Sequence, residues 1–331
     1  MLRVVQIGLG SIGRGIAERA RLAGWKLAGA VDPAPDLVGR DVGELLGGTP
    51  LGIEVCAAAA ELIDRVKPDV ALHATGSHLE EIEAQFRPLL RRGLAVVSTC
   101  EELSYPFYRH PELSRTLDAE ARDSGAVLLG TGVNPGFVMD KLVATLMASC
   151  DDVAVVRVSR IVDAGSRREP FQRKVGAGLT PAEFEARGNR LGHVGLAESA
   201  QMLGDAMRLG RQRTMRETLR PIVAESRVET EFLAVEPGQV AGIDQTATLE
   251  ADGVERVRMA LQMYVGAPQP QDAVSIEGSP PLEMVVTNGV PGDDATAALV
   301  IACAPLVRSL EPGLRTMLDL PLRPAFSRNP V

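Results

Sequence analysis

Two adjacent acidic residues have the residue type and position that proton transfer requires. Glu101 and Glu102 follow an apolar run, residues 94–99, after a single cysteine. A carboxylate just beyond a strand end can accept a proton, orient a water and stabilise positive charge. Glu101 is favoured because it lies closer to the strand end, and Glu102 remains the alternative. The competing interpretation is that both glutamates only cap the next helix.

A glycine-rich turn supplies the second candidate site. The sequence GLGSIG at residues 8–13 joins an apolar run, residues 4–7, to a segment of helical character. Gly8 permits a tight turn, Gly10 lets backbone N–H groups approach a pyrophosphate, and Gly13 lets the helix pack closely. Ser11 and Ile12 open that helix, whose N-terminus favours phosphate. The turn predicts dinucleotide binding.

An acid follows at the spacing that a dinucleotide fold requires. Asp32 ends a second apolar run, roughly 20 residues after Gly13, where it would meet the adenosine ribose. Ribose binding by Asp32 favours NAD. Arg40 is close enough in sequence to contact a 2′-phosphate, so NAD and NADP both remain candidates. The alternative is a glycine turn of another α/β protein, with Asp32 merely exposed.

Two further strand ends carry polar residues. Thr75, Gly76 and Ser77 follow an apolar run and would line the nicotinamide ribose. Asn134, in Asn-Pro-Gly, could hold the nicotinamide carboxamide or a substrate nitrogen, although the same tripeptide is typical of a plain turn. The histidines at 73 and 78 are assigned no proton-transfer role.

The elements around these residues change in character along the chain. Short apolar runs at 70–75, 94–99 and 126–131 alternate with predicted helices at 58–66, 79–92 and 113–124. This alternation is typical of a parallel, doubly wound Rossmann sheet, which binds ligands at the carboxyl ends of its strands. The sequence therefore predicts an α/β fold with a dinucleotide-binding domain over residues 1–135.

The remaining chain is predicted to form an α+β domain with an open mixed sheet, mostly antiparallel, over residues 136–294. Predicted strands span 153–162, 227–235, 245–250 and 257–265, and predicted helices span 138–149, 181–187 and 197–208. A strongly apolar helix at 295–310 begins a C-terminal part, 295–331, which is expected to return to the first domain. A proline-rich tail ends the chain.

Composition restricts the class of protein. The chain has 331 residues and a net charge of −8, with no block of like charges, which argues against nucleic acid or an anionic membrane as partner. No apolar run is long enough to span a bilayer, and the first strand begins too early to leave room for a signal peptide. Four scattered cysteines indicate reduced thiols in a cytoplasmic protein, and no cluster has metal-ligand spacing.

Several segments together resemble a known family. They are GLGSIGRGIA at residue 8, STCEELSYP at 98, GTGVNPGFVMDKL at 130, FQRKVGAGLT at 171, GHVGLAES at 192, GDDATAALV at 292 and PGLRTMLDLP at 312. They are similar to the 2,4-diaminopentanoate dehydrogenases and native NAD(P)-dependent amine dehydrogenases, which share the dihydrodipicolinate reductase fold. The resemblance implies NAD(P)-dependent oxidation of an amine without an α-carboxylate to a carbonyl compound and ammonia. It also implies a substrate domain that forms a homodimer, and one catalytic glutamate in the CEELSYP block.

The resemblance places polar substrate-pocket residues in the second domain. Arg160 could bind a substrate carboxylate, as 2,4-diaminopentanoate requires, and Asp163 lies at the exit of the same strand. His193, between glycines, could point into the same pocket. The competing interpretations are a surface strand with ordinary salt bridges and a loop histidine satisfied within the fold.

Three other functions are weighed against a general amine dehydrogenase. The first is 2,4-diaminopentanoate dehydrogenase itself. The second is a dihydrodipicolinate-reductase-like imine reductase, but the chain has no His-His pair and only four lysines. The third is a non-catalytic dinucleotide sensor, which would need no acid at the nicotinamide end.

Overall fold

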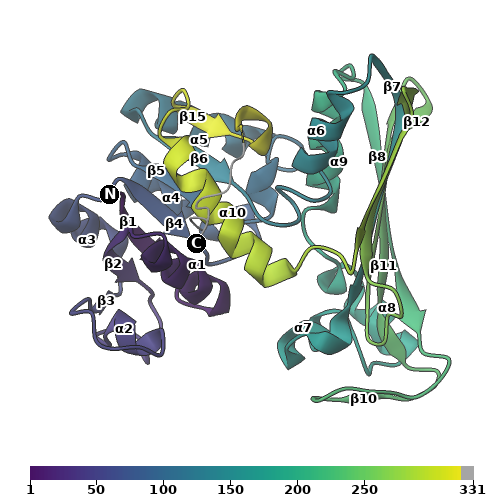
Figure 1. The fold of residues 1–331 in the computed structure, drawn as a ribbon, viewed down its shortest axis with the longest axis horizontal. Helices are drawn as coiled ribbons and strands as arrows, with labels where there is room; N and C mark the ends of the chain where they lie inside the picture. The colour runs from purple at the N-terminus through teal and green to yellow at the C-terminus, as the bar shows by residue number, and fades with distance from the viewer. Residues whose placement is uncertain (322–331) are drawn as a thin grey trace, which may run out of the picture. The chain divides into compact units, whose positions relative to one another are not determined.

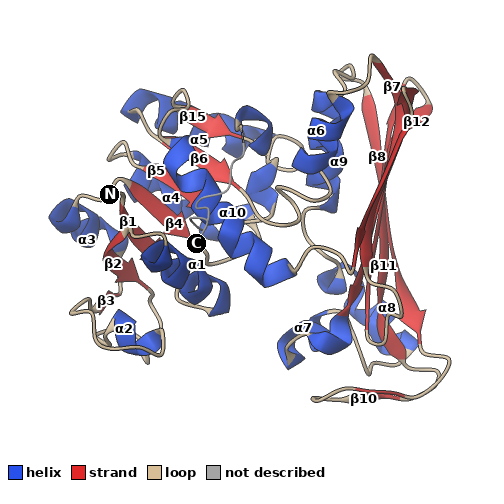
Figure 2. Cartoon of the chain, viewed as in Figure 1, coloured by secondary structure: helices blue, strands red, loops and turns tan. Residues whose placement is uncertain are grey.

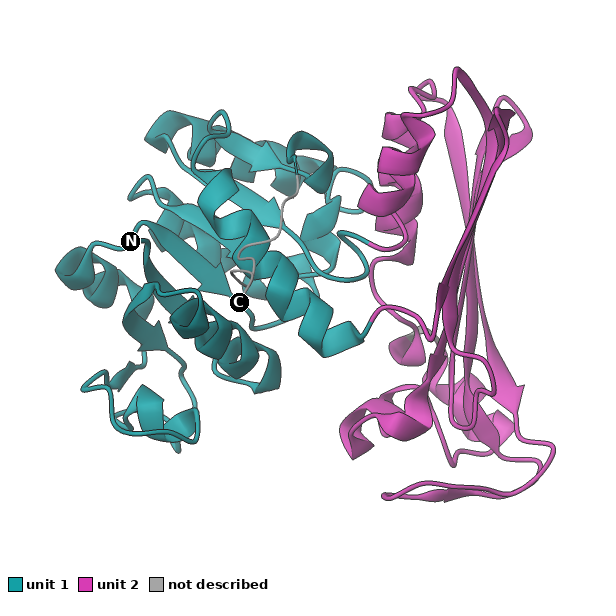
Figure 3. Ribbon diagram, in the orientation of Figure 1, with its two compact units in different colours: residues 1–137, 291–331 teal, residues 138–290 magenta. Residues whose placement is uncertain are grey.

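A computed structural model describes residues 1–321 of the chain (Figure 1). It divides into two compact units, residues 1–137 with 291–331 and residues 138–290 (Figure 3). The proline-rich tail predicted at the end of the chain lies outside the described residues. No helix within residues 1–321 is long and apolar enough to cross a membrane.

The first unit is built on a seven-stranded parallel sheet in the order β15-β6-β5-β4-β1-β2-β3 (Figure 2). Its strands are β1 (Arg3–Ile7), β2 (Lys26–Val31), β3 (Val55–Cys56), β4 (Val70–His73), β5 (Ala95–Ser98), β6 (Val127–Gly130) and β15 (Gly313–Arg315). The sheet order reverses between β1 and β4, which is where such sheets bind ligands.

Helices cover both faces of this sheet. They are α1 (Ser11–Leu22), α2 (Val42–Leu45), α3 (Ala59–Val66), α4 (Leu79–Leu90), α5 (Pro111–Ser124) and α10 (Gly292–Val307), with 3-10 turns η1 (Glu102–Ser104) and η4 (Met317–Asp319). Side chains from α3, α4 and α5, including Phe86 and Leu117, share one core with Val5 and Val96 of the sheet. Burial on both faces explains why these strands are almost wholly apolar.

The last helix belongs to the first unit. Helix α10 packs against α1, and Arg19 pairs with Asp294 at 2.6 Å. The chain then adds β15 beside β6, with the Gly313 N–H donating to the Ala126 carbonyl at 2.9 Å. The sequence pattern does not predict this short seventh strand, because three residues are too few to show a period.

The second unit is built on a six-stranded sheet in the order β14-β13-β7-β12-β11-β8, in which only β7 and β12 pair in parallel. Its strands are β7 (Asp152–Asp163), β8 (Arg213–Val223), β11 (Val240–Ala251), β12 (Val254–Tyr264), β13 (Gln271–Ser279) and β14 (Leu282–Thr287). Its helices are α6 (Lys141–Met147), α7 (Glu169–Lys174), α8 (Pro181–Arg187) and α9 (Leu196–Ala206), with 3-10 turns η2 (Ala164–Ser166) and η3 (Gly188–Leu191). Helix α9 packs on β11 and β12.

The α/β fold with a second mixed sheet confirms the predicted fold class. One predicted strand is wrong: residues 227–235 form a small hairpin of β9 (Val228–Glu229) and β10 (Ala234–Val235). The edge strands β8 and β14, with β13 beside β14, are not predicted. Strand β8 is mostly polar and carries Pro221, which an edge position tolerates, so its pattern is not that of a strand.

Candidate functional site

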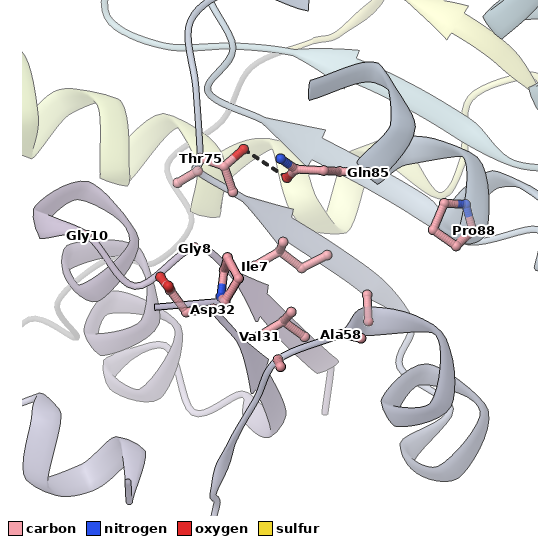
Figure 4. A pocket seen from close by; sticks show the side chains of 13 residues that line it. Ile7, Gly8, Gly10, Val31, Asp32, Ala58, Thr75, Gln85 and Pro88 are labelled. Atoms are coloured by element: carbon pink, nitrogen blue, oxygen red, sulfur yellow. Dashed lines mark hydrogen bonds between the residues drawn. The ribbon is translucent and has the colours of Figure 1, made fainter. Parts of the chain in front are cut away.

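A cavity of 610 Å³ lies at the carboxyl edge of the parallel sheet, beside the reversal point (Figure 4). It is lined by residues from the ends of β1, β2 and β4, from the glycine turn, and from α3 and α4. The lining residues are Ile7, Gly8, Gly10, Val31, Asp32, Pro33, Ala57, Ala58, Ala59, Ala74, Thr75, Gln85 and Pro88. The predicted cofactor residues Gly8, Gly10, Asp32 and Thr75 thus meet in one cavity.

The glycines of the turn have different reasons to lack a side chain. Gly8 has φ +84°, and a Cβ there would lie 2.2 Å from the Ala74 carbonyl oxygen. A Cβ on Gly13 would lie 2.0 Å from the Gly8 oxygen. A Cβ on Gly10 would meet nothing within 4 Å, although Gly10 lines the cavity. The fold therefore requires glycine at 8 and 13, whereas at 10 it leaves a space that a bound group can use.

Helix α1 begins at Ser11, with Gly10 as its N-cap and no side-chain cap. Its first N–H groups, which include those of Ser11 and Ile12, have no partner within the helix. Such groups at a helix N-terminus bind phosphate oxygens. The turn fits a pyrophosphate.

Asp32 is held in place by backbone donors. Its Oδ2 accepts from the Leu9 N–H at 2.7 Å and its Oδ1 from the Ala34 N–H at 3.0 Å. The carboxylate is half-buried at the cavity wall and keeps lone pairs for further donors. This geometry suits a pair of ribose hydroxyls.

Arg40 lies elsewhere. It lines a second cavity, of 740 Å³, with Glu44, Glu54 and Arg65, and this cavity shares no lining residue with the first. The structure therefore does not bring Arg40 together with Asp32, and its contact with a 2′-phosphate stays a prediction.

The segment around Glu101 is joined to the cavity edge. The Thr99 N–H donates to the His73 carbonyl at 2.9 Å, and the Glu102 N–H donates to the Ser77 carbonyl at 3.2 Å. The half-buried Glu101 thus lies beside the 75–77 segment, whose Thr75 lines the cavity. Gly76 and Ser77 belong to this segment but do not line the cavity.

Glu102 is committed to the fold. It is 7% exposed, and its carboxylate accepts from the Leu79 N–H at 2.7 Å, at the start of α4. It also lies 3.0 Å from His78 Nδ1 and 2.8 Å from His110 Nε2. Burial alone would raise the pKa of Glu102, but these hydrogen bonds outweigh it and hold the pKa below its usual value. Glu102 therefore caps α4, the helix before it.

His73 is fully buried and forms a polar chain. Its Nδ1 lies 2.9 Å from Ser98 Oγ, and its Nε2 lies 3.0 Å from Gln85 Oε1 and 3.1 Å from Thr75 Oγ1. Burial lowers its pKa to about 4, so the ring is neutral at pH 7. These contacts join the end of β4 to β5 and α4.

Asn134 is buried, 7% exposed, and joined by a cis peptide bond to Pro135. The preceding residue, Val133, donates its N–H to Thr296 Oγ1 on α10 at 3.1 Å. The segment is thus fixed within the first unit. A contact between Asn134 and cofactor or substrate stays a prediction.

Arg160 is paired inside the second unit. It is 4% exposed, its Nη1 contacts both carboxylate oxygens of Asp272 at 2.7 and 2.8 Å, and its Nη2 donates to the Val290 carbonyl at 2.6 Å. Arg157, three residues earlier, is exposed and pairs with Glu277. A substrate carboxylate at Arg160 would compete with Asp272, and its binding there stays a prediction.

Asp163 and His193 also contact the fold. Asp163 Oδ1 accepts from the Gly165 and Gly266 N–H groups at 2.9 and 3.1 Å. The His193 backbone exchanges two hydrogen bonds with the Gln245 carboxamide, at 2.7 and 3.0 Å. These contacts fix loops, and the predicted substrate contacts remain to be tested.

Two glutamines, one buried behind the glycine turn and one lining the cavity, were not predicted. Gln6 is fully buried and its Nε2 donates to the Gly8 carbonyl at 2.9 Å, which supports the glycine turn. Gln85 lines the cavity from α4. A lone glutamine in a strand or helix carries no motif, so the sequence offers no signal for either.

The cysteines and metal ligands add no further centre. All four cysteines are free thiols, and burial raises the pKa of Cys100 to about 12, so it stays protonated. Among the described residues, no group of three or more His, Cys, Asp or Glu could hold a metal ion.

Comparison with known proteins extends over the whole chain. A family model described as the 2,4-diaminopentanoate dehydrogenase C-terminal domain matches residues 137–329. The chain is 29% identical to 2,4-diaminopentanoate dehydrogenase from Acetoanaerobium sticklandii, covering 97% of this chain and 94% of that protein. It is also 29% identical to an amine dehydrogenase from Streptomyces virginiae, covering 99% and 98%.

A solved structure agrees. The amine dehydrogenase from Mycobacterium smegmatis is 27% identical, with a TM-score of 0.85 over 99% of this chain and 97% of that one. The family match covers more than half of the chain, and both sequence relatives and this structure match nearly its full length. The chain therefore belongs to the 2,4-diaminopentanoate dehydrogenase family of oxidoreductases, whose nucleotide-binding unit has the Rossmann fold.

Proposed function

We propose that this protein is an NAD(P)-dependent amine dehydrogenase. It oxidises an amine that lacks an α-carboxylate to a ketone or aldehyde and ammonia, and it catalyses reductive amination in reverse. The observation that carries the proposal is the position of Glu101, an acid at the end of β5 that is hydrogen-bonded through its neighbours to the edge of the dinucleotide cavity.

Glu101 is proposed as the general base. It would accept a proton from the substrate ammonium, orient the water that attacks the imine carbon, and stabilise the positive iminium. When bound, the nicotinamide accepts the hydride from the amine carbon. In reverse, Glu101 would hold ammonia and return the proton to the carbinolamine oxygen.

The commitment of Glu102 to α4 supports this choice between the two acids. A carboxylate that already accepts from Leu79, His78 and His110 has a lowered pKa and little freedom to take up a proton. Glu101 lies one residue closer to the strand end.

The cavity fits a dinucleotide, and Asp32 favours NAD. Gly10 leaves room for the pyrophosphate, and the Asp32 carboxylate would accept from the ribose hydroxyls but repel a 2′-phosphate. Arg40 lines a different cavity, which supports the choice of NAD over NADP. NADH is therefore expected to be the better cofactor.

The substrate is proposed to be a small amine. The relative from Acetoanaerobium sticklandii is a 2,4-diaminopentanoate dehydrogenase, which makes a substrate with a remote carboxylate the first choice to test. Arg160 would contact such a carboxylate only if its guanidinium bound the substrate and Asp272 at the same time. Asn134, Asp163 and His193 are the other proposed polar contacts of the substrate.

The proposal includes a homodimer in the cytoplasm. The family resemblance supports dimerisation through the second unit, and four free thiols support a reducing compartment. Light scattering of the purified protein tests the first point.

The experiment is an assay of reduced-cofactor consumption with ammonia and a panel of small ketones, aldehydes and amino-ketones, using NADH and NADPH in parallel. Turnover that requires ammonia is expected, with NADH preferred. Cofactor binding without turnover across the panel would contradict the proposal and favour a dinucleotide sensor. A cyclic imine reduced without ammonia would favour an imine reductase.

A further inference from the structure

The cavity has few polar side chains. Of the 13 lining residues, only Asp32, Thr75 and Gln85 carry one (Figure 4). The glycine turn and Asp32 form one side of the cavity. The rest of the wall is small and apolar and includes Ala57–Ala59, Pro33 and Pro88. A flat aromatic base fits such walls, and Gln85 is a polar group available to contact its edge.

The orientation of the Gln85 carboxamide is fixed by its neighbours. Its Oε1 accepts from Thr75 Oγ1 at 3.0 Å and lies 3.0 Å from His73 Nε2. The structure thus turns the carboxamide oxygen, which can only accept, toward Thr75 and His73.

The neighbours of His73 show which of its ring nitrogens carries the proton. Ser98 Oγ accepts from the Cys100 N–H at 3.1 Å and lies 2.9 Å from His73 Nδ1. Because the structure turns Gln85 Oε1 toward His73 Nε2, this nitrogen carries the proton of the neutral ring, and Nδ1 accepts from the Ser98 hydroxyl. Burial lowers the pKa of His73 to about 4, which keeps the ring neutral at pH 7.

The Gln85 amide nitrogen is left as a donor. Within residues 1–321 it makes no hydrogen bond to the protein, and both donors that face Gln85 are taken by Oε1. Its two N–H groups belong to a residue that lines the cavity, so a ligand with acceptor atoms can use them.

We propose that Gln85 reads the base of the dinucleotide by donating a hydrogen bond from Nε2 to a ring nitrogen of adenine. The pyrophosphate at Gly10 and the ribose at Asp32 leave the apolar part of the cavity for the base. This assignment puts Thr75, which contacts Gln85, at the adenosine end of the dinucleotide and not at the nicotinamide ribose expected from the sequence. Adenine has flat faces for the alanine and proline walls and ring nitrogens that accept. This inference rests on the dinucleotide of the proposed function but not on the amine chemistry.

Two substitutions test the donor. Gln85→Leu removes it, and Gln85→Glu keeps an oxygen for Thr75 and His73 but replaces the donor by an acceptor. Calorimetric titration with ADP-ribose, which cannot take part in hydride transfer, is expected to show binding about five- to tenfold weaker for Gln85→Leu. Gln85→Glu is expected to bind more weakly still. The control is Gln212→Leu, the same change at an exposed glutamine outside the cavity.

The atom contacted is tested with ADP-ribose analogues that carry CH in place of one adenine ring nitrogen, at position 1, 3 or 7. The wild type is expected to bind one of these analogues about five- to tenfold more weakly than ADP-ribose. Gln85→Leu is expected to bind that analogue and ADP-ribose with equal affinity. Nicotinamide mononucleotide, which lacks adenine, should bind alike to all variants.

Unchanged ADP-ribose affinity in variants whose melting temperature equals that of the wild type would overturn the proposal. So would an equal loss for nicotinamide mononucleotide, or discrimination among the analogues that persists in Gln85→Leu. Failure of amine turnover with ADP-ribose binding as expected would instead contradict only the proposed reaction.

Discussion

The two units use polar side chains in opposite ways. At the sheet edge of the first unit, Asp32 and Gln85 are held by neighbours yet keep hydrogen-bonding capacity beside a cavity. In the second unit, Arg160 and Asp272 satisfy each other and the Val290 backbone. A polar side chain that still has unused hydrogen-bonding groups beside a cavity indicates a ligand site. A pair whose hydrogen bonds are all made within the protein indicates a contribution to the fold.

The largest effect expected is on catalysis at Glu101. Glu101→Gln removes the proposed base without changing its shape, and turnover should fall roughly 10²- to 10⁴-fold. The melting temperature should stay close to that of the wild type. Steady-state rates with saturating cofactor measure the change, and the neighbouring Glu102→Gln is the matched comparison. Equal rates for Glu101→Gln and the wild type would show that Glu101 is not the general base.

The buried ion pair between Arg160 and Asp272 in the second unit should contribute to stability. Asp272→Ala leaves the buried Arg160 charge without its partner, which should lower the free energy of unfolding by about 3–5 kcal/mol. Urea denaturation measures this value. Glu277→Ala, which breaks the exposed pair with Arg157 between the same strands β7 and β13, is the control and should cost about 0–1 kcal/mol. Similar costs for the two variants would contradict the comparison.

Glu102 should behave as a structural acid with a defined pH dependence. Glu102→Gln should lower the free energy of unfolding by roughly 1–3 kcal/mol at pH 7. Because the folded-state pKa of Glu102 lies below the ordinary value of 4.5, its contribution is complete above that pH and is lost as the pH falls through the folded-state pKa. Denaturation at pH 7, 5 and 3 should show the two proteins converging. A gap that widens with acid would show the opposite sign.

The smallest effect is expected for substitutions in the glycine turn, where Gly10 and Gly13 should respond differently. Gly10→Ala places a methyl group in open space, so stability should hardly change, while NADH affinity should fall about tenfold because the methyl occupies the phosphate site. Fluorescence titration of NADH measures it. Gly13→Ala meets the Gly8 carbonyl and should lose stability. Full NADH affinity in Gly10→Ala would place the pyrophosphate elsewhere.

Local patterns were sufficient for much of the first unit and for one helix of the second. The GLGSIG turn, the apolar runs of β4, β5 and β6, and the Pro181–Arg187 helix with its Thr180 and Glu183 capping box all carry their signal within a few residues. The edge strands β8 and β14 do not, because half-exposed edge positions accept polar residues and make the period hard to recognise.

Residue type and short spacing were enough to predict the Rossmann fold, the glycine turn with Asp32, and the acidic pair after β5. Three contacts could be recognised only in the folded chain: Glu102 caps α4, Asp272 pairs with Arg160, and Gln85 lines the cavity. The physical reason is that a side chain's role depends on which of its hydrogen bonds are already made. Those partners lie up to 112 residues away in the chain.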